Sequence, residues 1–249
     1  MMPSGAIAYA HARMRGCKSH LLTRADAAPL FTAGDAAAMR RVVAALGLED
    51  PMQRLLRVYA TAIRGYPRGA PLFRALLQLH EIENVKLEWR RGRDTANDFA
   101  GTPFAQIVKT VARAHGDDIA AAELAFDRWA SQRSLDEAYR LPRRETLARR
   151  LVELVVKERD SEIVRRGAKW YGLTSVTGIA EDVMSLRRER LHLCRRAFVG
   201  SPFLLAPAVA VILLAEEEVR AVRALVERQG DERLDPPLLR ALAGSQLGA

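Results

Sequence analysis

The sequence has few of the residues that mark disulfide-bonded or β-rich proteins. Its 249 residues include only two cysteines, Cys17 and Cys194, and 6% aromatic residues. Two cysteines are too few for a disulfide framework, and neither lies in a Cys-x-x-Cys motif, which suits a reducing compartment. There is also no Asn-Gly or Asp-Gly hairpin signal, and the valines and isoleucines fall in segments of helical period. The sequence therefore predicts an all-α protein.

Motifs that hold metals or nucleotides are also missing. The histidines are scattered, and no His-x-x-x-His or Cys-x-x-Cys pattern offers metal-ligand spacing. Cys17 with His20, and His192 with Cys194, give only two ligands each, so we favour solvated or core positions for them. No Walker A loop or Gly-x-Gly-x-x-Gly motif occurs. We therefore expect no metal, no cofactor and no catalytic residues.

Signals for secretion or membrane insertion are weak. Residues 1–12 contain no long apolar run, which predicts a cytosolic protein. The segment 197–215 has no charge and approaches the roughly 20 residues that span a bilayer. Gly200-Ser201-Pro202 and Pro207 interrupt it, however. We expect a turn followed by a buried core helix.

The chain is strongly basic, with a net charge of +9 and a pI near 10.1. Such a charge favours an anionic partner, although an excess of arginine and alanine is also typical of GC-rich coding sequences. Arginines concentrate in 140–150 and 187–196. On a helical wheel those of 187–196 spread over more than half of the circumference, and no RNA-recognition motif or aromatic stacking platform accompanies them.

The most regular segment begins at Pro207 and meets no helix breaker before Gly230. Its apolar positions lie three and four residues apart, as one face of a helix requires; they are Ala208, Val211, Ala215, Val219, Val222 and Val226. Charge appears only after Ala215. We expect the first half to be buried on all sides and the second to be amphipathic, with the acidic run Glu216–Glu218 on a solvated face.

Similar reasoning divides the rest of the chain into helices. Two capping-box spacings, Thr95–Asp98 and Ser134–Glu137, predict helix starts near residues 96 and 135. Proline and glycine positions bound the other segments. The expected helices are 5–15, a broken pair in 25–46, 52–63, 71–91, 103–114, 117–129, 142–170 and 179–198.

Two polar residues, His80 and Asn84, interrupt an apolar stripe that Phe73, Leu76 and Leu87 mark on the helix 71–91. They are either a polar contact with a partner helix or a hydrogen-bonded layer inside the bundle. Because buried polar groups are generally hydrogen-bonded, we favour the layer.

A pattern of acid, valine and base follows an apolar segment at three places. Residues 218–223 align with 81–86 and with 160–165, which places Glu81, Asp160 and Glu218 in register. Any amphipathic helix places such residues at these offsets, so spacing alone leaves both a repeat and a coincidence open. The second interval between the acids is the shorter one.

These segments carry a resemblance to a known family, together with Tyr9-Ala-His-Ala-Arg13-Met-Arg15, Lys18-Ser-His-Leu21-Leu22 and residues 207–242. The chain resembles the C subunit of the bacterial and archaeal V-type (A-type) ATPases, which corresponds to the eukaryotic d subunit. The resemblance implies repeated helical-bundle units that form a funnel. It also implies a non-catalytic rotor adaptor that seats the central axle on the membrane proteolipid ring.

Several expectations follow from this resemblance. An N-terminal helical region with the first repeat helix would occupy 1–92, a middle helical repeat 93–172 and a C-terminal helical repeat 173–249, with one repeat abbreviated. The alternative is that the three form one continuous domain. The protein would lie at the cytoplasmic face of the membrane, held through protein contacts, with no direct nucleic-acid binding. Candidate partner contacts are Arg143, Arg144, Arg187 and Arg188. The alternative is a basic, all-helical nucleic-acid-binding protein.

Overall fold

The computed structural model describes residues 4–22, 28–29, 33, 36–47, 50–91, 99–116, 118–170, 177–201 and 203–227. These residues form helices and no strand, which confirms the all-α prediction. The helices are α1 (Ser4–Ser19), α3 (Ala36–Ala45), α4 (Pro51–Gly65), α5 (Ala70–Arg90), α7 (Ala105–His115), α8 (Ile119–Tyr139), α9 (Thr146–Trp170), α10 (Thr177–Arg196) and α11 (Ala206–Glu227).

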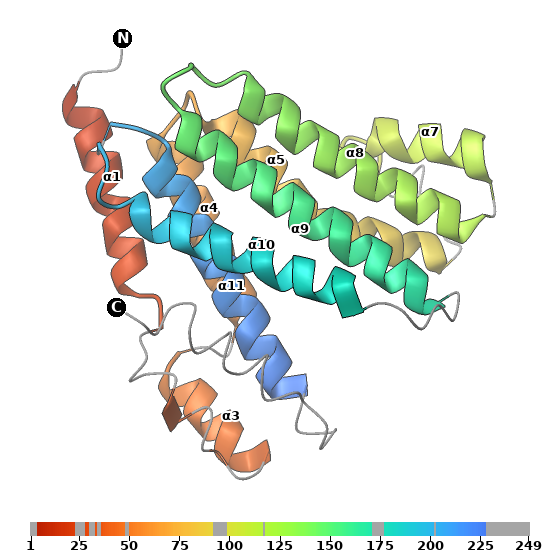
Figure 1. Cartoon of the computed structure of the whole chain (residues 1–249), viewed down its shortest axis with the longest axis horizontal. Coiled ribbons are helices and arrows are strands. Elements are labelled where there is room, and N and C mark those ends of the chain that lie inside the picture. The colour runs from red at the N-terminus through yellow and green to blue at the C-terminus, as the bar shows by residue number, and fades with distance from the viewer. Residues whose placement is uncertain are drawn as a thin grey trace.

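All of these helices except α3 pack into one bundle, and α3 lies to one side of it with its main contact on α11 (Figure 1). Helices α8 and α9 run side by side, α5 lies against α8, and α10 crosses in front of α11 while packing on α9. Helix α1 flanks one end and packs on α4 and α11. Repeated bundle units are not evident from this arrangement, and the repeat remains a prediction.

Local sequence explains the starts of α4 and α8. Asp50 caps α4 by accepting a hydrogen bond from the backbone N–H of Gln53 at 2.8 Å, and Pro51 occupies the first turn as expected. Asp118 caps α8 in the same way, through the N–H of Ala121 at 3.0 Å. The predicted start near residue 96 lies outside the described residues, as does most of 25–35.

Some predicted boundaries are wrong. The helix predicted for 5–15 continues to Ser19, and the helix start predicted near residue 135 does not occur. Ser134 does not begin a helix near 135, because α8 runs unbroken from Ile119 to Tyr139. The Ser134 side chain is buried, and its hydroxyl donates to the carbonyl oxygens of Ala130 (3.1 Å) and Ala75 (3.3 Å). Capping-box spacing also occurs inside helices, where a serine hydroxyl can bond the preceding turn instead.

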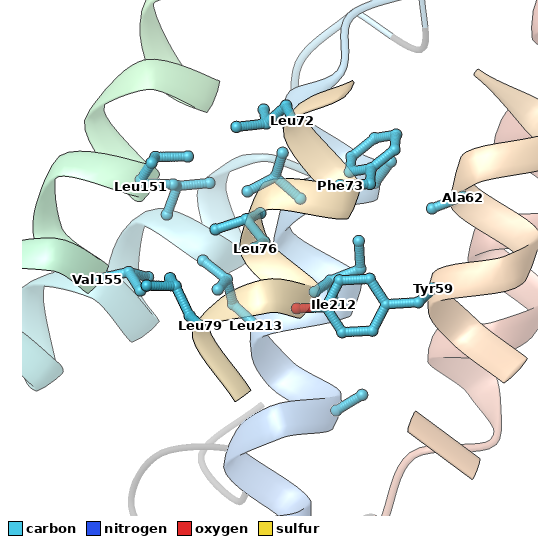
Figure 2. Close-up of a cluster of buried hydrophobic side chains, with 14 of the residues drawn as sticks. Tyr59, Ala62, Leu72, Phe73, Leu76, Leu79, Leu151, Val155, Ile212 and Leu213 are labelled. Atoms are coloured by element: carbon cyan, nitrogen blue, oxygen red, sulfur yellow. The ribbon is translucent and has the colours of Figure 1, made fainter. Parts of the chain in front are cut away.

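The core is centred on α5 and α11 (Figure 2). Residues from four helices meet there: Tyr59 and Ala62 of α4, Leu72, Phe73, Leu76 and Leu79 of α5, Leu151 and Val155 of α9, and Ile212 and Leu213 of α11. All of α11 from Ala206 to Ala215 is buried. The expectation of a turn followed by a buried core helix is therefore confirmed.

The buried face of α5 differs from the predicted stripe. Leu87 is 45% exposed and Asn84 is exposed, whereas Gln78 and Lys86 are buried. The reason is that α5 is covered from two directions, by α4 and by α8, so a single stripe does not describe it. His80 does join a hydrogen-bonded layer inside the bundle, but Asn84 does not.

No helix among the described residues combines the length and hydropathy needed to cross a bilayer.

Candidate functional site: charged clusters around a cleft

A cleft of about 410 Å³ opens between α4, α5, α9, α10 and α11. Apolar side chains such as Leu55, Leu79 and Val219 form part of its lining. The rest of the lining is charged or titratable: His80, Glu83, Lys86, Glu158, Arg159, Glu162, Arg187, Glu216 and Arg220. The charged or titratable residues, except Glu162, which pairs with Arg165 on the same helix, belong to three clusters that connect the helices.

The first cluster surrounds Glu216 of α11, which is 4% exposed. Tyr59 of α4 donates its hydroxyl to Oε1 at 2.5 Å, and Nε2 of His80 on α5 lies 2.8 Å from the same oxygen. Burial alone would raise the pKa of Glu216. The charge and hydrogen bond of His80, the charge of Arg220 and the bond from Tyr59 outweigh burial and lower the pKa to about 2. Glu216 is therefore a permanently ionised acceptor at neutral pH.

The second cluster centres on Arg190 of α10, whose side chain is 1% exposed. Its Nε donates to Glu158 of α9 at 2.8 Å, and one terminal nitrogen donates to Glu217 of α11 at 3.0 Å. Arg187 also pairs with Glu217, and Arg220 reaches Glu158 at 3.0 Å. Burial would raise the pKa of Glu158, but Arg190 and Arg220 overcome it and lower that pKa. The cluster therefore links α9, α10 and α11 through ionised groups.

The third cluster joins α5, α8 and α9. Lys86 Nζ contacts both carboxylate oxygens of Asp127, at 3.0 and 3.1 Å, and lies 2.8 Å from Glu83. Arg159 of α9 reaches Asp127 at 2.5 Å and Glu83 at 2.8 Å. Lys86 and Asp127 are both buried. Two cations thus share two carboxylates across three helices.

Glu218 completes a row of three buried acids. Its carboxylate pairs with Arg54 of α4 at 3.1 Å and accepts the backbone N–H of Leu22 at 2.6 Å. The predicted solvated face for this acidic run is therefore wrong, since Glu216, Glu217 and Glu218 are all at most 4% exposed. Their partners come from other helices, far away in the sequence. Local spacing carries no signal for such partners.

The predicted contact arginines lie in two places. Arg143 and Arg144 are exposed on the turn between α8 and α9, and Arg188 is exposed on α10. Arg187 needs correction as a surface residue, because its side chain is only 14% exposed and pairs with Glu217. Burial lowers its pKa to about 10, which leaves it charged at neutral pH. The structure does not bring the four arginines together.

The three acids in register, Glu81, Asp160 and Glu218, have different surroundings. Asp160 accepts a hydrogen bond from Ser131 at 3.3 Å, while Glu218 pairs with Arg54. Burial raises the pKa of both Glu81 and Asp160. The shared spacing of these acids is thus not matched by a shared environment.

No metal-holding arrangement occurs in the described part of the chain: no group of three or more His, Cys, Asp or Glu residues is suitably placed there. Cys194 is fully buried, and burial raises the pKa of its thiol to about 12. Such a thiol packs as a small apolar side chain.

No protein-family model matches the chain, and no curated protein or solved structure shows significant similarity to it.

The clusters can fix the helices in one register. A buried charge that loses its partner is strongly unfavourable, so sliding one helix along another would break several such pairs at once. The site is thus suited to holding helices rigidly against one another.

Proposed function

We propose that this protein is a non-catalytic adaptor of a V-type or A-type rotary ATPase. It would connect the membrane proteolipid ring to the central axle at the cytoplasmic face. The observation that carries the proposal is the position of the segments that resemble the C subunit of these ATPases. Residues 81–86 lie in α5, residues 160–165 in α9, and residues 207–227 of the segment 207–242 in α11, and all three helices contribute to the core.

The packing supports a mechanical role. An adaptor that passes torque must resist deformation, and close-packed interiors transmit strain. In this chain α11 is buried on all sides over Ala206–Ala215. Beyond that point Glu216, Glu217 and Glu218 bond to α4, α5 and α10. The central helix is therefore held along most of its length.

Exposed arginines are the proposed charged rims of the partner contacts. Arg143, Arg144 and Arg188 are exposed and can steer association without contributing to the core. Rim charges act mainly on association rate and register. Arg187 has no part in this role, because it pairs with Glu217.

The test is a pull-down of the tagged full chain from native membranes, extracted in mild detergent with nuclease present. We expect proteolipid-ring and axle subunits in the eluate. The Arg188→Glu variant should assemble more slowly than the parent. The control variant Arg113→Glu changes an exposed arginine of α7 and should assemble normally. Recovery of nucleic acid or ribosomal proteins without ring or axle subunits would overturn the proposal.

Salt dependence separates the adaptor from a nucleic-acid-binding protein, the alternative that the net charge of +9 favours. Binding to phosphates weakens steeply and linearly with the logarithm of salt concentration. A protein contact with a large apolar component weakens less. If partner proteins are lost from the pull-down as steeply with added salt as phosphate binding predicts, the nucleic-acid-binding alternative would be favoured.

A further inference from the structure

Three turns meet at one end of the bundle (Figure 1). We call this surface the turn end; it consists of residues 65–70, 140–146, 197–201 and 203–205. Glu145 accepts a hydrogen bond from the backbone N–H of Leu205 at 2.9 Å. The Leu205 side chain lies so close to Gly69 that a Cβ there would meet it at 2.9 Å. The turns between α4 and α5, α8 and α9, and α10 and α11 are therefore adjacent.

Helix α1 adds two cations beside this end. Arg15 donates to the carbonyl oxygen of Phe198 at 3.2 Å, and Lys18 Nζ lies 4.1 Å from the centre of the Phe198 ring. Neither contact neutralises the cation. Both hold positive charge next to the turn between α10 and α11.

The turn end and its border are rich in cations without carboxylate partners. Arg68, Arg143, Arg144 and Arg196 are exposed, and within the described residues none of them forms an ion pair. The acids here are already engaged. Glu145 is 3% exposed, bonded to the backbone and influenced by the charge of Arg144, and Glu137 on the border pairs with Arg140. Like charges gathered in this way repel one another, so an anionic partner would relieve the repulsion.

Two apolar side chains project among these cations. Val199 is 88% exposed and Phe203 is 50% exposed, and both lie on the turn between α10 and α11. Exposed apolar residues bordered by cations are typical of surfaces that bind anionic membranes, where phosphates pair with the cations and the apolar groups enter the headgroup region. A valine side chain has no ring on which bases could stack, and stacking is the main apolar contact of proteins that bind single-stranded nucleic acid.

We propose that the turn end binds the surface of anionic lipid bilayers directly, with Val199 and Phe203 entering between the headgroups. The ligand chemistry is the phosphate of an anionic phospholipid together with the acyl boundary below it. This inference goes beyond the proposed function, which requires only protein contacts with the membrane, and it does not depend on it.

The test is co-sedimentation of the purified full chain with protein-free vesicles. One set is phosphatidylcholine alone, and the other contains equal parts of phosphatidylcholine and phosphatidylglycerol. We expect binding to the anionic vesicles only, falling with added salt. Because a Lys or Arg near an anionic surface contributes about 1 kcal/mol, Arg143→Gln with Arg144→Gln should lower partitioning about 30-fold. Phe203→Ser should lower it about tenfold, through lost apolar burial.

The matched control is Lys109→Gln with Arg113→Gln on α7, which removes the same charge from exposed positions at the other end of the bundle (Figure 1). It should lower partitioning less than twofold. Circular dichroism checks that each variant remains helical. Equal losses in the control and in the Arg143/Arg144 variant would overturn the proposal, because binding would then follow net charge alone.

Three further outcomes would also overturn it. One is equal binding to both kinds of vesicle, and another is unchanged binding of Phe203→Ser. The third is full displacement by glycerol phosphate at the headgroup concentration, which would indicate a site for free phosphate. A DNA duplex is tested in the same way. If Phe203→Ser lowers DNA binding as much as it lowers vesicle binding, the turn end would instead be a nucleic-acid-binding surface. The vesicles contain no protein, so a failure to bind them would not affect the adaptor proposal. That proposal is tested separately, by the pull-down from native membranes.

Discussion

Two adjoining parts of α11, its apolar half (Ala206–Ala215) and its acidic half (Glu216–Glu218), are both buried, but by different interactions. From Ala206 to Ala215 the helix is apolar and is packed on every side by other helices. From Glu216 to Glu218 it is acidic and no more exposed, because cations and a tyrosine from other helices pair with each carboxylate. Burial of the first half is favourable at about 25 cal/mol per Å² of apolar surface. Burial of the second half depends on every partner being present.

The two halves differ more in how they tolerate substitutions than in how much they stabilise the fold. An apolar contact loses stability in proportion to the atoms removed, whereas a buried ion that loses its partner leaves an uncompensated charge. The acidic half should therefore respond more abruptly to substitution, and it should respond to pH.

The largest expected effect is that of Glu217→Ala. The change leaves Arg190 and Arg187 without one of their carboxylates, so we expect unfolding to become easier by about 3–5 kcal/mol. Urea denaturation followed by circular dichroism measures this. The control Glu189→Ala removes an exposed acid paired with Arg150 and should change stability by less than about 1 kcal/mol. Equal changes in the two variants would show that the acidic half is not buried as described.

Ile212→Ala tests the apolar half. Ile212 is fully buried, and removing its side chain should lower the free energy of unfolding by about 3 kcal/mol, with Ile212→Val costing about 1 kcal/mol. Both losses should be the same at low and high salt, since no charge is involved. A loss that depends strongly on salt would contradict the apolar assignment.

Part of the pH dependence should come from Glu216. Its pKa falls from 4.5 to about 2 in the folded state, so its stabilisation is complete above about pH 4.5 and is lost as the pH falls toward 2. The shift corresponds to about 3 kcal/mol. In Glu216→Gln this part of the dependence should disappear. Denaturation curves between pH 7 and pH 3 measure it, and parallel profiles for parent and variant would refute the assignment.

The smallest expected change in stability is that of Arg188→Ala, which is compared with Arg187→Ala at the neighbouring position on α10. Arg188 is exposed, so Arg188→Ala should change stability by no more than about 0.5 kcal/mol. Arg187→Ala removes a partner of Glu217 and should cost about 2 kcal/mol, less than Glu217→Ala because Arg190 still holds the acid. Thermal denaturation of both variants resolves this. An equal cost would return Arg187 to the surface, where sequence reasoning had placed it.

Sequence reasoning predicted the helices better than the site. Helical period and proline positions bounded α4, α5, α9 and α11 closely, because these signals act within a few residues of the chain. On α9, for example, Leu151, Leu154 and Val155 recur at helical spacing and all three are buried. Local patterns were enough wherever a helix buries one continuous face.

The charged clusters could not be predicted in the same way. Glu216 has Tyr59 and His80 as partners, and Glu217 has Arg190, all on other helices. Such pairs depend on how the helices pack, which the spacing within one helix does not contain. From the sequence alone, an acidic run on an otherwise apolar helix face can therefore either be exposed to solvent or pair with buried cations. Arg187 was misplaced for the same reason, because its partner lies on another helix.

The position of the acidic row within the chain has a consequence for protein synthesis. Helix α11 is made after α4, α5 and α10, so during translation His80, Arg187 and Arg54 emerge long before the carboxylates that pair with them. Glu145, conversely, is ready to accept the N–H of Leu205 as soon as α11 begins. A chain that stops before residue 206 lacks both the central apolar helix and these counter-charges. The last described helix to leave the ribosome thus supplies the carboxylates that pair with Arg54, His80 and Arg187, and these charged contacts form only after it has been made.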